Sequence, residues 1–299
     1  MRFMKIKENQ ILSKRSPVER IVFTVVFCVF AVYAVSMIFP LIWLVMSSMK
    51  TSTDYALDVM NLKPFALPRS WEGLSNYVQV FEKLKYKDTT YLEMIFNSIW
   101  YIVFSVVPHL FCSSLFGYVM AKYKFKGREF IHGLVIFTMT VPIVGTGGAY
   151  YVMVNQMGIF NTPLYPLLTN IYCFGHFLYM YAAYKNISWD YAEAVFIDGG
   201  NHWTAYFNVM MPQAMPLIST LAITMSISQW NTYEGVLMYL PDYPTVASGL
   251  YQASMTLNRS GGATLYYTGL VVSIIPILVL FIVFADKLMK NLSVGGLKG

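Results

Sequence analysis

Long apolar runs alternate with short polar segments along the whole chain. Charged residues are absent from five of these runs, at residues 21–49, 94–121, 130–184, 199–233 and 260–285. A helix needs about 20 apolar residues to cross a bilayer, so each run is long enough to span a membrane. The pattern therefore predicts membrane helices along most of the chain.

The run at residues 130–184 is too long for one crossing. Its 55 residues would extend about 82 Å as a single helix, against a hydrocarbon core of about 30 Å. A break is supplied by Gly158, Asn161, Pro163 and Pro166, because Pro lacks a backbone donor and Gly and Asn favour turns. We therefore predict six transmembrane helices, at about 20–48, 92–121, 129–155, 163–185, 213–238 and 264–289.

The composition also indicates that the chain lies in a membrane. Hydrophobic residues make up 57% of the 299 residues and charged residues 12%, whereas a soluble domain carries about 25% charged residues. Cys28, Cys112 and Cys173 lie inside apolar runs, which predicts packing residues and no disulfide framework. We expect an all-α, polytopic membrane protein that forms a single membrane domain over residues 1–299.

Basic residues predict the orientation. Of the 21 Lys and Arg residues, 14 lie in the two terminal tails or after the second and fourth predicted spans. Six of the other seven lie in the long polar segment 50–92, where the positive-inside rule weakens. We therefore expect cytoplasmic N- and C-termini, a tail and first helix at 1–50, an extracytoplasmic segment at 50–92 and a membrane core at 92–289. The first apolar run is too long for a cleaved signal peptide and predicts a retained helix.

One cytoplasmic segment, residues 188–212, predicts two short helices joined by a tight turn. Ser188 is a suitable N-cap, and Asp190 favours the positive first turn of a helix. The pair at 199–200 is Gly-Gly and ends the first helix, because glycine accepts the left-handed C-cap conformation. Asn201 can cap the second helix, and Pro212 is expected to start a new element, where its missing N–H costs nothing.

Both short helices are amphipathic. The residues that share a side are Trp189, Val195 and Phe196 in the first helix and Trp203, Phe207 and Met210 in the second. Aromatic side chains on the cytoplasmic side of a membrane protein need a partner that buries them. Either a separate protein or the chain's own helix ends can do so, since amphipathic helices usually face their own core.

The same segment resembles the EAA loop of ABC importer permeases. Glu193-Ala194-Val195 is followed after three residues by Gly199, and after nine more by Val209-x-Met211-Pro212. The family pattern is Glu-Ala-Ala, three residues, Gly, nine residues and Ile-x-Leu-Pro, so every spacing matches. The departures are Val195 for Ala, Val209 for Ile and Met211 for Leu.

Weaker matches resemble the carbohydrate branch of that family. The string Ile197-Asp198-Gly199-Gly200 is close to its Ile-Asp-Gly-Ala, and Gly200 in place of Ala is expected to loosen the turn slightly. Residues 229–231, Gln-Trp-Asn, resemble its Trp-Asn segment, and residues 294–299 resemble its Gly-rich Val-Lys-Gly tail. The resemblance covers about 90–299 and points to the maltose-type, binding-protein-dependent group and its oligosaccharide-importing relatives.

The resemblance implies a type I ABC importer permease fold, a place in the bacterial cytoplasmic membrane and a sugar or oligosaccharide cargo. In this family the EAA loop is a coupling helix that docks on an ATPase. By that resemblance the ATPase-coupling residues are Glu193, Ala194, Asp198, Gly199, Trp203, Phe207 and Pro212. The implied partners are a second homologous permease subunit, two ABC ATPase subunits and an extracytoplasmic solute-binding protein meeting residues 50–92 and 241–262. The C-terminal tail either reaches the ATPase or frays.

The sequence carries no nucleotide site of its own. A P-loop needs Gly-x-x-x-x-Gly-Lys-Ser/Thr, and no Gly-Lys pair occurs in the chain. We therefore expect no enzymatic activity and no cofactor in this chain, with ATP and Mg bound by the partner ATPase. No metal site is expected either, because the histidines lack metal-ligand spacing.

Polar and aromatic residues inside the predicted spans are candidates for the substrate path. Tyr172, His176 and Tyr179 share a helical face with Tyr165 in the fourth span. The fifth span adds Gln229, Trp230 and Asn231. A sugar favours aromatic platforms beside polar groups, but helix packing through interhelical hydrogen bonds accounts for the same residues.

Other functions are possible. A secondary transporter is expected to carry charged or discontinuous helices near mid-membrane and often internal repeats, which these charge-free spans do not indicate. A membrane enzyme needs a cluster of acid, base or metal-binding residues, and none is evident. A permease for a non-sugar solute is opposed only by the weaker branch-specific matches.

Overall fold

The computed structural model describes residues 17–141, 145–172, 174–256 and 262–294, and side chains up to residue 284. This part of the chain is almost entirely helical. Its elements are α1 (Pro17–Ser48), α2 (Ser52–Met60), α3 (Ser75–Lys83), β1 (Lys85–Tyr86), β2 (Thr89–Thr90), α4 (Tyr91–Lys122), α5 (Arg128–Thr140), α6 (Gly147–Gln156), α7 (Leu164–Thr169), α8 (Phe177–Asn186), α9 (Asp190–Ile197), α10 (His202–Ala205), the π-helical turn η2 (Tyr206–Met210), α11 (Met211–Trp230), α12 (Glu234–Tyr239), α13 (Val246–Thr256) and α14 (Ala263–Val294).

Four described helices are long and apolar enough to cross a membrane. They are α1, α4, the continuous run from His202 to Trp230, and α14 as far as Phe284. Each coincides with a predicted span, so the chain is a mostly helical, polytopic membrane protein. The fifth predicted span is displaced towards the C-terminus, however, because its helix already begins at His202 and ends at Trp230, and α12 is a separate short helix.

The third and fourth predicted spans are not single helices. The third is divided into α5 and α6, and the 13 residues of α5 extend only about 20 Å. The fourth is divided into α7 and α8, with non-helical backbone after Asn170. The turn between these two predicted spans is confirmed, since Gly158 and Asn161 have φ values of +68° and +54°.

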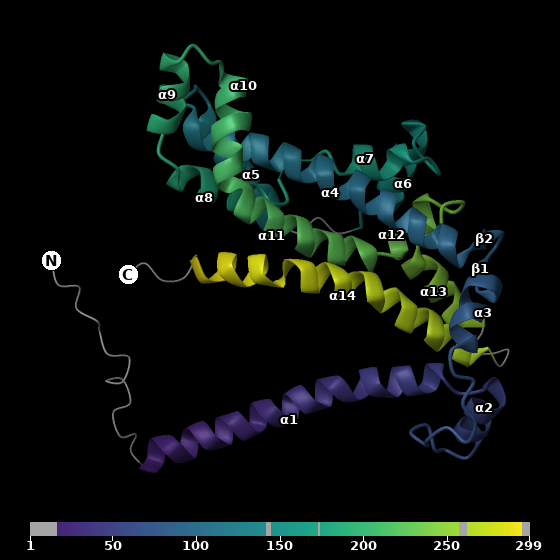
Figure 1. Cartoon of the computed structure of the whole chain (residues 1–299). Coiled ribbons are helices and arrows are strands. Elements are labelled where there is room, and N and C mark those ends of the chain that lie inside the picture. The colour runs from purple at the N-terminus through teal and green to yellow at the C-terminus, as the bar shows by residue number, and fades with distance from the viewer. Residues whose placement is uncertain (1–16, 142–144, 173, 257–261, 295–299) are drawn as a thin grey trace.

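Helices α4, α11 and α14 lie side by side, and α8 packs closely on α4 (Figure 1). The closest approach is at Gly117 of α4, where a Cβ atom would lie 2.6 Å from Cβ of Met180 in α8. The start of α1, the end of α14 and the α9–α10 hairpin lie at one end of the molecule, and α2, α3 and β1–β2 lie at the other (Figure 1).

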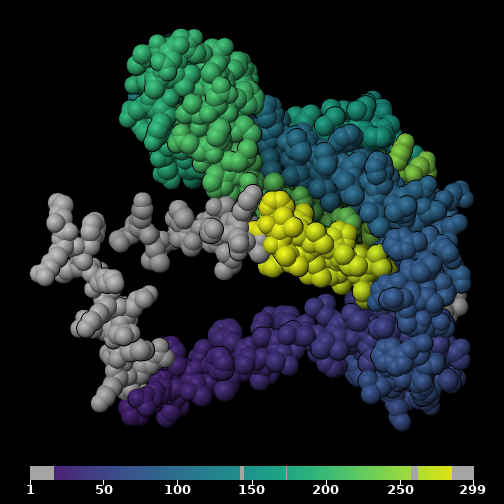
Figure 2. All heavy atoms as spheres, viewed as in Figure 1, coloured from purple at the N-terminus to yellow at the C-terminus, as the bar shows by residue number. Residues whose placement is uncertain are grey.

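Helix α1 diverges from the other helices. It meets α14 near its C-terminal end, where Trp43 contacts Tyr267 with ring centroids 5.3 Å apart and Thr268 Oγ1 donates to the carbonyl of Ser48. Figure 2 shows α1 separated from α14 towards its N-terminal end. Its apolar side chains are largely exposed within this chain, which fits contact with lipid or another subunit.

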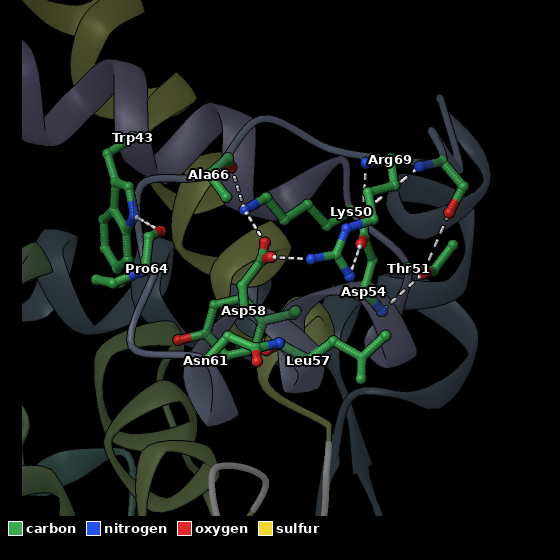
Figure 3. A network of polar contacts seen from close by, with 12 residues as sticks. Trp43, Lys50, Thr51, Asp54, Leu57, Asp58, Asn61, Pro64, Ala66 and Arg69 are labelled. Carbon is green, nitrogen blue, oxygen red and sulfur yellow. Dashed lines mark hydrogen bonds and ion pairs between the residues drawn. The ribbon is translucent and has the colours of Figure 1, made fainter.

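A buried ion network holds the segment after α1. Lys50 Nζ donates to Asp58 Oδ2 over 2.7 Å and to the carbonyl of Ala66 over 2.6 Å, and neither Lys50 nor Asp58 exposes more than 1% of its side chain (Figure 3). Arg69 lies 3.4 Å from the second Asp58 oxygen and 3.6 Å from Asp54. A charge removed from water is tolerated only when it is paired, so this network fixes α2 against the end of α1.

Candidate functional site

Residues 188–212 form the predicted hairpin of two short helices, between α8 and α11. It is the projection beyond the end of the helix bundle in Figure 2. Gly199 ends α9 with φ +82°. The Gly199 N–H donates to the carbonyl of Phe196 over 3.1 Å, and the Gly200 N–H donates to that of Val195 over 2.8 Å. These two bonds define a Schellman motif, which confirms the predicted tight turn.

The two helix starts match the prediction to different degrees. Asn201 caps α10 as predicted, because its Oδ1 accepts from the Thr204 N–H over 2.9 Å. Ser188 is not the N-cap of α9, since that position belongs to Trp189. Ser188 Oγ instead accepts from the Asp190 N–H over 3.3 Å. The predicted start of the first helix is therefore wrong by one residue.

Pro212 lies in the first turn of α11, as predicted, but no break separates α11 from the hairpin. The helix continues from His202 to Trp230, and the turn before Pro212 is π-helical, with the Met211 N–H donating to the carbonyl of Tyr206. Pro has no N–H to donate, and its ring crowds the carbonyl four residues earlier. The side-chain amide of Gln213 donates to the carbonyl of Val209 over 3.2 Å, which does not replace the donor that Pro212 lacks.

The inner face of the hairpin packs on the chain's own helix ends. Ala192 and Ala205 are fully buried, and Val195 and Phe196 pack against the same core cluster. Tyr123, which follows α4, meets the Trp189 ring at 5.5 Å and bonds His202 Nδ1 over 2.8 Å. The aromatic side chains of this face are therefore partly buried by the chain's own helix ends, which is one of the two alternatives given by the sequence analysis.

The outer face of the hairpin remains exposed. Glu193, Ala194, Asp198 and Gly199 are all on the surface. Among the described residues, the side chains of Glu193 and Asp198 form no hydrogen bond or ion pair. Helix α9 also exposes two apolar side chains that the sequence analysis did not name as coupling residues, Tyr191 at 53% and Ile197 at 85% exposure. Exposed apolar groups on a rigid projection are typical of an interaction surface.

The predicted aromatic pair of the second helix lies at the side of the hairpin. Trp203 and Phe207 are stacked, with ring centroids 5.8 Å apart and planes at 21°. Phe207 also stacks on Phe111 of α4 at 6.3 Å. Trp203 is 57% exposed and Phe207 44%, so this pair braces the hairpin against α4 while leaving ring surface free.

The substrate-path candidates before the hairpin lie at the break before α8. His176 Nδ1 and His109 Nε2 of α4 are 2.8 Å apart, and the His109 ring contacts Tyr172 at 4.6 Å. Tyr179 is exposed one turn further along. The predicted face shared with Tyr165 is wrong, because Tyr165 belongs to α7 and stacks on Tyr239 in a different core cluster.

The candidates after the hairpin lie at the end of α11. Trp230 is buried in a core cluster at the outer end of the molecule, with residues of α3, α4, α13 and α14. Asn231 is exposed, and its Nδ2 donates to the carbonyl of Ile227 over 2.8 Å. Trp230, Asn231, Tyr233 and Tyr251 line a hollow of about 220 Å³, while Gln229 does not. No observation tests a substrate role for any of these residues, so that role stays a prediction.

These features define a helical membrane protein with one rigid hairpin that projects from its helix bundle. Residues 113–293 match the family model of the binding-protein-dependent transport system inner membrane component. The chain belongs to this family. It is therefore a multi-pass permease of the bacterial inner membrane and a transport subunit, not an enzyme, in a system whose other components include a binding protein and an ATPase.

Several characterised proteins are similar over nearly their whole length. The arabinooligosaccharides transport system permease protein AraQ of Halalkalibacterium halodurans is 27% identical over 288 residues, which cover 96% of this chain and 99% of that protein. The diacetylchitobiose uptake system permease protein NgcG of Streptomyces coelicolor is 25% identical, over 88% of this chain and 85% of that protein.

The fold also matches a solved structure. A chain of a bacterial ABC transporter involved in the import of the acidic polysaccharide alginate superposes with a TM-score of 0.76 at 21% identity. The match covers 92% of this chain and 99% of that one. At this identity the likeness establishes the ABC importer permease fold.

Proposed function

We propose that this chain is one of two pore-forming permease subunits of an importer for a sugar or oligosaccharide, and that residues 188–212 couple it to a separate ATPase. One observation carries the coupling role: the hairpin is packed on its inner face yet leaves the apolar side chains of Tyr191 and Ile197 exposed on α9. A rigid element of this kind can transmit a push from a partner into α8 and α11, which flank it directly.

The proposed topology has six crossings, with both termini and the hairpin in the cytoplasm. The start of α1, the end of α14 and the hairpin at one end of the molecule support it (Figure 1). The basic residues Lys122, Lys124, Lys126, Arg128 and Lys185 flank the hairpin end of α4, α5 and α8, as the positive-inside rule requires. In this topology α5–α6 and α7–α8 are broken crossings, and such breaks are tolerated where they are buried in protein or line a water-filled path.

The sugar cargo is supported by the names of the relatives. They include permeases for diacetylchitobiose, arabinooligosaccharides and maltodextrin. A non-sugar solute is the alternative. Screening glycans against the purified binding protein of the same system would decide between them, and binding of no glycan would contradict the sugar assignment.

The proposed assembly contains a second related permease, two ABC ATPase subunits and the solute-binding protein, with ATP and Mg bound by the ATPases. The exposed apolar length of α1 supports contact with a second subunit or lipid. Residues 50–92, held rigid by the Lys50 network, and residues 241–262 would meet the binding protein. Residues 257–261 of that surface lie outside the described residues, as do residues 295–299 of the C-terminal tail.

The double variant Glu193→Ala with Gly199→Pro tests the coupling role. Proline fixes φ near −65°, whereas Gly199 has φ +82° and its N–H closes the turn. The complex is expected to insert in the membrane but to lose uptake while its ATPase still hydrolyses ATP. The control is Glu129→Ala with Gly127→Pro, which alters another cytoplasmic loop whose Gly127 has φ +88°. Wild-type uptake by the hairpin variant would end the coupling proposal.

A further inference from the structure

Three buried hydroxyl groups meet where the hairpin joins the helix bundle. Tyr206 OH donates to Ser114 Oγ over 2.9 Å, and Ser114 Oγ shares a second hydrogen bond with Tyr184 OH over 2.6 Å. Each of the three residues is at most 1% exposed. Ser114 belongs to α4, Tyr184 to α8 and Tyr206 to η2. We refer to Ser114, Tyr184 and Tyr206 as the hydroxyl triad.

The triad joins the two chain segments that flank the hairpin to a third helix. Tyr184 lies in the last turn of α8, just before the hairpin, and Tyr206 is the first residue after α10. Both bond the same oxygen atom of α4, which is far away in the sequence. Hydrogen bonds in a water-free interior are directional and costly to leave unmade, so the two entry segments and α4 are held in one register.

The π-helical turn makes this link important. Tyr206 lies on the hairpin side of η2, and α11 begins on the other side. Because Pro212 donates no backbone hydrogen bond, the helix is weakest between the hairpin and α11. A displacement of the hairpin can be absorbed there before it reaches α11, whereas the triad reaches α4 without crossing the turn.

We propose that Ser114, Tyr184 and Tyr206 are positioning residues that carry displacement of the hairpin into α4, so that the hairpin, α8 and the inner half of α4 move as one body. This inference rests on the proposed coupling function. It adds α4 to α8 and α11 as a helix that receives the movement. It also identifies η2 as the turn at which α11 can move less than the hairpin does.

Distance measurements between spin labels on the hairpin and on α4 test the proposal. Ile197→Cys labels the exposed tip of α9 and Val107→Cys an exposed position of α4, with Cys28, Cys112 and Cys173 replaced by Ser. The assembled complex is measured without nucleotide and after trapping with ATP and vanadate. In the labelled protein with the native triad, the distance between the two labels is expected to be the same in both states. In Ser114→Ala and in Tyr206→Phe it is expected to shift or broaden on trapping.

Two further variants separate this role from simple packing. Ser114→Thr keeps the hydroxyl and is expected to restore the constant distance. Tyr118→Phe removes a hydroxyl from the same core cluster, outside the triad, where its partner Tyr123 is 3.4 Å away, and it is expected to behave as the native protein.

Loss of packing alone would lower the melting temperature without a nucleotide-dependent change in distance, and that result would overturn the proposal. The proposal would also be overturned if the label-to-label distance changed on trapping in the protein with the native triad. Should Ser114→Ala fail to assemble, Tyr206→Phe alone decides, because it keeps the ring. Failure of the coupling function itself would appear separately, as wild-type uptake by the Glu193→Ala, Gly199→Pro variant.

Discussion

Val195 and Gly200 fit together across the turn of the hairpin: a Cβ atom at position 200 would lie 2.5 Å from Cγ1 of Val195 and 2.9 Å from its carbonyl oxygen. Both positions differ from the EAA pattern of the carbohydrate branch, which has Ala at each. The larger side chain at 195 occupies the space that a side chain at 200 would need. Gly200 is thus a packing requirement in this chain, and the looser turn expected from it stays a prediction.

Gly200→Ala is expected to destabilise the hairpin, because overpacking a filled site costs about 1–3 kcal/mol. Adding Val195→Ala should recover part of that loss, since it removes the 2.5 Å contact but leaves the 2.9 Å contact with the carbonyl oxygen and the 3.4 Å contact with Thr204 Cγ2. The thermal midpoint is measured for the native complex, for Gly200→Ala, for Val195→Ala and for the double variant, which together form a double-mutant cycle.

Gly148→Ala is the matched control, because a Cβ atom at that helical position would have no neighbour within 4 Å. Its midpoint should be unchanged or slightly higher. If Gly200→Ala proved as harmless as Gly148→Ala, the fit between positions 195 and 200 would have no energetic weight.

The parts of the structure set by local sequence were predictable. The charge-free runs gave α1, α4 and α14 to within a few residues at most boundaries. The hairpin followed from Gly199 and Asn201, whose conformational and capping preferences act on neighbouring backbone groups. Pro212 lies in the first turn of α11, as predicted, but the continuity of α11 with the hairpin through a π-helical turn was not predicted, because the local sequence around a proline does not distinguish such a turn from a break.

The long-range contacts could not be derived from the sequence. At the break in the fourth span, His176 forms a hydrogen bond with His109 of another helix, 67 positions away. The hydroxyl triad likewise joins Ser114 to Tyr206 across 92 positions. A periodic pattern assigns a residue to a face of its own helix, but it gives no information about which distant residue that face meets.

His176→Leu tests whether the histidine pair is structural or lines the substrate path. It removes the 2.8 Å hydrogen bond and leaves Nε2 of buried His109 with only the 3.5 Å contact to Ser113 Oγ, which costs about 1–3 kcal/mol. A structural role predicts a lower melting temperature with little change in the KM of uptake. Leu178→Ala, at an exposed position of the same helix that is not a substrate-path candidate, is the control. A raised KM with an unchanged melting temperature would favour the substrate path.

Gly117→Ala is expected to force α4 and α8 apart. A Cβ atom at this position would lie 2.6 Å from Met180 Cβ and 3.0 Å from the backbone of Met180 and Tyr181, and backbone atoms cannot rotate away. Small residues allow such close approach between membrane helices. We expect a fall in melting temperature larger than that of Gly200→Ala, together with reduced uptake. Gly133→Ala, where nothing lies within 4 Å, should have neither effect.

The buried pair Lys50–Asp58 makes the outer segment sensitive to loss of either charge alone. Lys50→Met leaves Asp58 buried, with only the 3.4 Å contact to Arg69 Nη2 to balance it, and breaking a buried pair costs about 3–5 kcal/mol. Asp58→Leu should cost a similar amount. The double variant Lys50→Met, Asp58→Leu should cost much less than the sum of the two single variants, because neither position 50 nor position 58 then carries an unpaired buried charge.

Arg69→Gln is the control: Arg69 is 53% exposed, so its loss should cost under about 1 kcal/mol. The melting temperatures of the two single variants, the double variant and Arg69→Gln are compared with that of the native complex. Additive losses in the double variant would show that the charges of Lys50 and Asp58 do not depend on each other.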